Sequence, residues 1–192
     1  MNWIKRVVLT TLCCAAASAG PIIFTETQNG IGSLGGKAFS APVTIVLTSD
    51  TSTITGGSGV FFDIGPATVT VAGIPGTATF VDTIEAVVNQ GCPCAGFSDE
   101  TTDLSVMFDT NSAFSTYDLS TAIGPLLGES SGNSGLGFST SMGAFILSSS
   151  LNNEEHPATF TATTVGSVPE PGTLGLLAAG IALFLIRRRV AG

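Results

Sequence analysis

The sequence offers few residues for acid–base or nucleophilic catalysis. His156 is the only histidine, and Lys37 is the only basic residue between positions 20 and 167. A serine nucleophile would need His156 as its base, but this histidine lies in the polar segment 152–157, which is typical of a surface loop. Paired carboxylates could hydrolyse glycosidic bonds, yet positions 20–167 contain no tryptophan and only Tyr117 to stack on a sugar ring. The sequence therefore predicts that the chain is not an enzyme.

Cys92-Pro93-Cys94 is the most unusual local motif of the chain. In an oxidising compartment, two neighbouring cysteines are expected to pair with each other. The favoured interpretation is a disulfide that staples the loop 89–98. The alternatives are an intermolecular link and a loop that is redox-active or contacts a metal, although a metal site would need more thiolate or imidazole ligands than this chain offers.

The acidic residues of the segment 99–109 offer oxygen ligands of the kind that calcium prefers. The candidates are Asp99, Asp103 and Asp109. Their spacing does not follow the EF-hand pattern, and solvated surface acids explain the segment equally well. We therefore expect no cofactor and assign no metal site, with calcium at these three residues as the alternative.

The segments that carry these residues are predicted to be β-strands. Short runs rich in threonine, valine and phenylalanine are separated by Gly, Pro, Asn and Ser, and Gly73–Gly76 is a turn signal. The predicted strands are 39–48, 59–64, 67–72, 77–81, 104–108, 143–148 and 158–165. Only 118–127 could form a turn or two of helix, and Gly124-Pro125 limits even that. The pattern predicts an all-β ectodomain over residues 20–166, an antiparallel β-sandwich or jelly roll.

Residues 1–19 have the pattern of a signal peptide. Lys5 and Arg6 precede the apolar segment Val7–Ala17, and Ala17-Ser18-Ala19 is a small-x-small cleavage site. The sequence therefore predicts export across the inner membrane through the translocon.

The tail, residues 167–192, combines a sequence motif, an apolar run and a basic cluster. Val168-Pro169-Glu170-Pro171 comes before the uncharged run Leu174–Ile186, and this run ends at Arg187, Arg188 and Arg189. Fifteen residues from position 172 would span about 22 Å as a helix, which is short of the roughly 30 Å hydrocarbon core, although long arginine side chains recover part of the deficit. Because positive residues stay on the cytoplasmic side, a single C-terminal transmembrane helix would leave the bulk of the chain outside.

These three parts, in this order, resemble the PEP-CTERM sorting signal of Gram-negative bacteria. The resemblance implies that an exosortase, a membrane-embedded cysteine protease-transpeptidase, recognises Pro169, Glu170 and Pro171 and removes the tail. It also implies that Leu174–Ile186 is a transient anchor in the inner membrane and that the three arginines are its cytoplasmic stop. The segments 112–119 and 123–125 resemble the uncharacterised β-rich ectodomains that precede such tails.

The same resemblance implies a place at the cell surface or in the extracellular matrix, in association with exopolysaccharide and biofilm. Of the fourteen acidic residues, all but Glu170 lie between residues 20 and 167, where Lys37 is the only base, and this balance disfavours nucleic acid and anionic lipid as partners. We therefore expect a non-catalytic exported surface or matrix protein. The alternative is an adhesion module that binds polysaccharide or calcium.

Overall fold

The computed structural model describes residues 20–131, 135–150 and 158–165. The predicted signal peptide, His156 and the sorting tail lie outside these ranges, and with the tail the predicted stop residues Arg187, Arg188 and Arg189. Within the described ranges, no helix is both long enough and apolar enough to cross a membrane.

The described chain is all-β, as predicted, and its strands pair antiparallel. Its strands are β1 (Pro21–Leu34), β2 (Lys37–Asp50), β3 (Thr55–Gly57), β4 (Val60–Ile64), β5 (Ala67–Val71), β6 (Ala78–Thr79), β7 (Ile84–Asn89), β8 (Cys94–Asp99), β9 (Leu104–Thr110), β10 (Ile123–Ser131), β11 (Gly137–Thr140), β12 (Gly143–Ser150) and β13 (Ala158–Thr164). A short 3-10 helix, η1 (Ser112–Thr116), follows β9.

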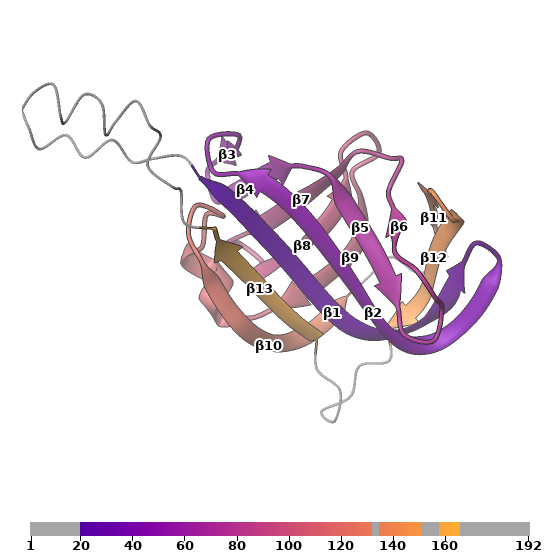
Figure 1. The fold of residues 1–192 in the computed structure, drawn as a ribbon. Helices are drawn as coiled ribbons and strands as arrows, with labels where there is room; N and C mark the ends of the chain where they lie inside the picture. The colour runs from indigo at the N-terminus through magenta and orange to yellow at the C-terminus, as the bar shows by residue number, and fades with distance from the viewer. Residues whose placement is uncertain (1–19, 132–134, 151–157, 166–192) are drawn as a thin grey trace, which may run out of the picture.

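The strands form one curled sheet whose two halves face each other across the core (Figure 1). The strand order is β3-β4-β7-β8-β9-β10-β13-β1-β2-β5-β6, and β12 pairs with β1 and β11. Strand β10 joins the halves, because its first part pairs with β13 and its last residues pair with β9. The sheet is therefore continuous through β10.

The hairpin of β1 and β2 is the longest unit, paired from Pro21 and Asp50 to Leu34 and Lys37. Alternate residues of β2 point into the core, as the predicted strand 39–48 requires. Strand β1 has the same alternation, but Glu26 occupies one of its inward positions. This polar residue interrupts the apolar pattern, and the sequence analysis did not predict β1.

The predicted turn or two of helix at 118–127 is wrong. The structure has the 3-10 turn η1 before this segment and the strand β10 from Ile123 onward. Asp118 Oδ1 accepts hydrogen bonds from the backbone N and the hydroxyl of Ser120, at 3.1 and 2.6 Å, which favours a turn over a helix. Gly124 has a φ of +89°, which no α-helix accommodates, and Pro125 lacks a backbone donor.

The core is one apolar cluster between the two halves of the sheet. Phe114 of η1 is fully buried, and its ring meets that of Phe160 edge to face with centroids 5.3 Å apart. Asn111 caps η1 by accepting a hydrogen bond from the backbone N of Ala113 at 2.9 Å. The Tyr117 hydroxyl donates to the carbonyl of Thr121 at 2.9 Å, and Gln90 Nε2, just after β7, donates to the carbonyl of Tyr117 at 2.8 Å, so the segment after η1 is tied to the end of β7.

Candidate functional site

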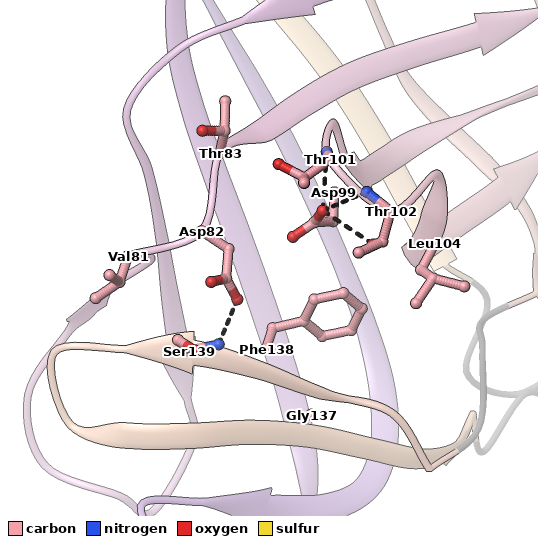
Figure 2. Close-up of a pocket in the computed structure, with 10 residues that line it drawn as sticks. All are labelled: Val81, Asp82, Thr83, Asp99, Thr101, Thr102, Leu104, Gly137, Phe138 and Ser139. Atoms are coloured by element: carbon pink, nitrogen blue, oxygen red, sulfur yellow. Dashed lines mark hydrogen bonds between the residues drawn. The ribbon is translucent and has the colours of Figure 1, made fainter.

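A hollow of about 450 Å³ opens at the end of the sheet where β8 turns into β9 (Figure 2). Three segments surround it: the link between β6 and β7, the β8–β9 turn, and β11. The lining residues are Val81, Asp82, Thr83, Asp99, Thr101, Thr102, Leu104, Gly137, Phe138 and Ser139. Carboxylates and hydroxyls therefore gather around one opening.

The link before β7 is fixed to β11 by hydrogen bonds. The Asp82 carboxylate accepts from the backbone N of Ser139 at 2.5 Å, and the backbone N of Val81 donates to the carbonyl of Ser139 at 2.8 Å. Next to them, Phe80 bridges to Thr140. Asp82 is therefore held at the rim by the strand that faces it.

Asp99 organises the β8–β9 turn. Its Oδ1 accepts from the backbone N of Thr101 at 3.0 Å and from both the backbone N and the hydroxyl of Thr102 at 2.9 Å. The backbone N of Glu100 donates to the carbonyl of Thr83 at 2.9 Å, which ties the turn to the link on the other side of the hollow. These bonds give Asp99 a structural role in shaping the opening.

The lining suits a polyhydroxylated ligand better than an aromatic one. Figure 2 shows the Phe138 ring between Asp82 and Leu104, at the floor of the hollow. This ring is only 3% exposed, so it offers little face for stacking. Asp82, Thr83 and Thr101 line the same hollow, and their polar groups can exchange hydrogen bonds with hydroxyl groups.

Glu85 is a third acid near this end of the sheet, beside Asp82 and Asp99. It is buried on β7, and the Ser98 hydroxyl donates to its Oε1 at 2.8 Å. Burial raises the pKa of Glu85 above its ordinary value, and the charges of Glu100, Asp103 and Asp99 add to that increase. The Ser98 hydrogen bond acts in the opposite direction but is the weaker effect.

The three calcium candidates are not brought together. Asp99 and Asp103 lie at the β8–β9 turn, where Asp99 pairs with Leu104. Asp109 lies at the other end of β9, where it pairs with Ala95 and faces the core. Among residues 20–131, 135–150 and 158–165, no group of three or more His, Cys, Asp or Glu side chains is arranged to hold a metal ion.

Asp109 instead meets Glu26 in the interior. Both side chains are 0% exposed, and none of their four carboxylate oxygens makes a hydrogen bond of regular geometry; the backbone N–H of Thr110 acts on Asp109 and lowers its pKa, but by less than burial raises it. Burial raises the pKa of Glu26 well above its ordinary value, and the charge of Asp109 adds to this; burial raises the pKa of Asp109 to about 7. The sequence analysis missed Glu26, although the alternation of Ile22, Phe24 and Glu26 along β1 places it on the inward face.

Cys92 and Cys94 form a disulfide at the turn between β7 and β8, with their Cα atoms 5.3 Å apart. Cys92 is exposed and Cys94 is partly buried. The backbone N of Asn111 donates to the carbonyl of Pro93 at 3.0 Å, so the turn is held by the segment that follows β9. This turn lies at the opposite end of β8 from Asp99 and the hollow.

Comparison with known families identifies the tail. The family model described as the PEP-CTERM protein-sorting motif matches residues 167–189. The chain carries a PEP-CTERM sorting motif. No curated protein and no solved structure matches the chain.

The matched range covers every residue that the sequence analysis assigned to sorting, although the separate roles of these residues remain predictions. They are Val168, Pro169, Glu170 and Pro171 of the motif, and Arg187, Arg188 and Arg189 of the predicted cytoplasmic stop.

The PEP-CTERM motif makes the chain an exported protein that is sorted and processed by an exosortase. The motif indicates association with the membrane or the cell surface. The hollow at the β8–β9 turn, the disulfide turn and the interior acids all belong to the domain that precedes the motif.

Proposed function

We propose that the chain is a non-catalytic protein of the cell surface or extracellular matrix of a Gram-negative bacterium, delivered there by exosortase sorting. The observation that carries this proposal is the PEP-CTERM motif at 167–189, joined to one β-domain with a single core. The described part of that domain contains neither histidine nor arginine, so it holds no Ser–His or Cys–His pair for nucleophilic catalysis. These two facts favour an exported domain with a non-catalytic role over an exported enzyme.

The proposed destination is the exopolysaccharide of the biofilm matrix. Before processing, Leu174–Ile186 anchors the chain transiently in the inner membrane. After the exosortase removes the tail, the mature domain keeps no membrane helix of its own, as in other tail-removal signals. Its acidic residues keep it soluble and repel anionic lipid, which supports a place among hydrated polymers.

A second candidate function is an adhesion module that binds polysaccharide, and the hollow at the β8–β9 turn favours it. A volume of about 450 Å³ lies in the range of small-molecule sites, and its hydroxyl and carboxylate lining matches the hydrogen-bonding groups of a sugar. In the calcium-dependent form of this proposal, acids of the β8–β9 turn such as Asp103 would share a cation with the polymer.

The two candidates differ in whether the purified protein binds exopolysaccharide saturably. The measurement is co-sedimentation of the exported protein with exopolysaccharide from its host, over a range of protein concentrations. An adhesion module gives a saturable isotherm that weakens for Thr83→Val in the hollow and is unchanged for Thr163→Val, an exposed threonine on β13. A matrix protein without a sugar site gives no saturation, and neither variant changes the result.

The non-catalytic part of the proposal has its own test. Incubation of the protein with the same exopolysaccharide should produce no new reducing ends and no decrease in polymer length. Steady release of reducing ends that depends on protein concentration would contradict it.

A further inference from the structure

Four polar side chains meet inside the curled sheet, where its two halves face each other. Glu26 and Gln28 point inward from β1, Asp109 points inward from β9, and Ser130 lies on β10. The Ser130 hydroxyl donates to Gln28 Oε1, and Ser130 is the register partner of Asp109. The charge of Asp109 acts on Glu26, so the four residues form one connected cluster, which we call the interior cluster.

The interior cluster has too few hydrogen-bond partners. In the described part of the chain, six buried side-chain polar atoms lack a partner, and five of them belong to Glu26, Gln28 and Asp109. Buried polar groups in folded proteins are normally paired, so a cluster of this size is typical of a site that holds an ion or ordered water. All three side chains are at most 1% exposed, so bulk solvent does not satisfy them.

Two glycines lie directly against the carboxyl groups. A Cβ at Gly96 would lie 3.0 Å from Glu26 Oε2, and a Cβ at Gly128 would overlap Asp109 Oδ1. Neither glycine has a positive φ, so backbone conformation does not require glycine at these positions. Glycine is required there because a side chain would overlap neighbouring atoms. Both carboxyl groups therefore stand against bare backbone.

No basic side chain of the described ranges is close enough to neutralise the cluster. Lys37 is the only lysine or arginine there, and it pairs with Leu34 at the far end of the hairpin. Leu34 lies eight positions beyond Glu26 along β1, which is about 26 Å at the usual rise of a strand. The facing elements β8, β10 and β13 contribute no other charged side chain to the cluster, because Glu129 of β10 is exposed and Asp99 lies at the far end of β8.

We propose that the interior cluster is a binding site for one divalent cation of the calcium or magnesium class, with Glu26 and Asp109 as its charged ligands and Gln28 as a neutral ligand. Two carboxylates balance the charge of such an ion, and their four unpartnered oxygens are the ligand type that it prefers. Exchange of the Gln28 amide oxygen and nitrogen lets Nε2 donate to Ser130 and turns Oε1 toward the unpartnered position. The ion would be enclosed as β9 and β10 fold over β1.

The competing arrangement is a pair of acids kept neutral by protons. Burial raises the pKa of both carboxyl groups, so protons can take the place of a cation. The two arrangements are distinguishable because only the first makes stability depend on a cation.

The test uses the exported protein, unfolded in denaturant with chelator and then refolded by dilution. Thermal unfolding is recorded in calcium chloride, in magnesium chloride and in sodium chloride of equal ionic strength, and native mass spectrometry counts bound metal. We expect one ion per chain and a Tm that rises with the concentration of calcium or magnesium only. Both effects should disappear in Glu26→Gln and in Asp109→Asn.

Asp63→Asn is the matched control, because Asp63 is also buried with an unpartnered oxygen but lies on β4, outside the cluster. It should keep the cation-dependent increase in Tm. Asp103→Asn, at the exposed β8–β9 turn, should keep it too.

Two results would overturn the proposal. One is wild-type protein that refolds without metal and has the same Tm in all three salts, which leaves the protonated pair as the explanation. The other is a cation effect that survives in Glu26→Gln or disappears in Asp103→Asn, which assigns the ion to surface acids. If the Glu26 and Asp109 variants do not fold, the metal count and the salt series of the wild-type protein still decide the question.

Discussion

Glu85 shows how a single buried carboxyl group links the stability of the domain to pH. Its pKa is raised above the ordinary value of 4.5, chiefly by burial, so the folded state holds the proton more tightly than the unfolded chain does. The contribution of Glu85 to the free energy of unfolding is therefore fully present below pH 4.5. It is lost as the pH rises through the raised pKa.

Glu85→Gln should remove that contribution. A glutamine still accepts the Ser98 hydrogen bond through its oxygen but does not titrate. We expect the decrease in the free energy of unfolding above pH 4.5 to become shallower in this variant. Urea denaturation over a pH series measures it, with Glu129→Gln, an exposed residue of β10, as the control that keeps the wild-type profile. A steeper decrease in Glu85→Gln would contradict the assignment.

The cysteines allow a second prediction at the residue scale. A bond between Cys92 and Cys94 closes a loop with one intervening residue, so it removes little conformational freedom from the unfolded chain. The Cys92→Ser, Cys94→Ser double variant should therefore lose about 1.5 kcal/mol of stability or less. Thiol titration of the exported wild-type protein without reductant should find no free thiol from this pair. Two reactive thiols would show that the pair stays reduced.

At the scale of the elements, Gly32 marks a close contact of β1 with β12. The register of these strands shifts between Ile31 and Gly32, and a Cβ at Gly32 would overlap the carbonyl oxygen of Ile146. Backbone cannot move aside as a flexible side chain can, so Gly32→Ala should cost about 1–3 kcal/mol of stability, as overpacking usually does.

Gly137→Ala is the matched control for this change. Gly137 lies on β11, next to the same strand β12, and a Cβ there would meet its nearest atom at 3.5 Å, an ordinary contact. Chemical denaturation of both variants should show a loss for Gly32→Ala alone. Equal losses would mean that the cost comes from the alanine itself and not from the contact with β12.

The sequence analysis identified strands that carry short runs rich in threonine, valine and phenylalanine. It predicted β2, β4, β5, β9, β12 and β13, and the turn at Gly73–Gly76 between β5 and β6, since alternation and turn signals mark them directly. It missed β1, where Glu26 and Gln28 replace apolar residues on the buried side, and β7, whose residues are buried on both faces and do not alternate. It also did not predict β3, β8, β10 and β11.

The candidate sites were harder to predict because they depend on pairing between distant strands. The hollow combines residues from 81 to 139, and the interior cluster combines residues from 26 to 130. Asp99 and Asp109 are only ten positions apart in the sequence, so without the strand pairing they look like neighbours. In the structure they lie at opposite ends of the β8–β9 hairpin. The sorting motif could be predicted from the sequence because its Pro-Glu-Pro segment, apolar run and arginines are contiguous.

At the scale of the whole molecule, the sorting motif governs where the domain goes. Alanine at Pro169, Glu170 and Pro171 should block exosortase processing. Intact mass should then include the tail, and fractionation should find the protein with the membrane. Pro75→Ala, a proline in the exposed turn between β5 and β6, should be processed like the wild type. Equal processing of the triple variant and the wild type would refute the role of these residues.

The two ends of the domain leave it side by side. Ile22 at the start of β1 pairs with Thr164 at the end of β13, and the backbone N of Val165 donates to the carbonyl of Pro21 at 2.9 Å (Figure 1). A chain held by its tail is therefore attached at one point of the domain, next to the start of β1.

The position of β13 sets the order in which the domain can fold during secretion. It is the last strand of the described chain, yet it lies in the middle of the sheet, between β10 and β1. Until residues 158–164 have crossed the membrane, β10 and β1 lack their shared neighbour and the two halves of the sheet remain unconnected. Strand β13 ends at Thr164 and the sorting motif begins at residue 167, so the strand that completes the sheet comes directly before the segment that addresses the protein.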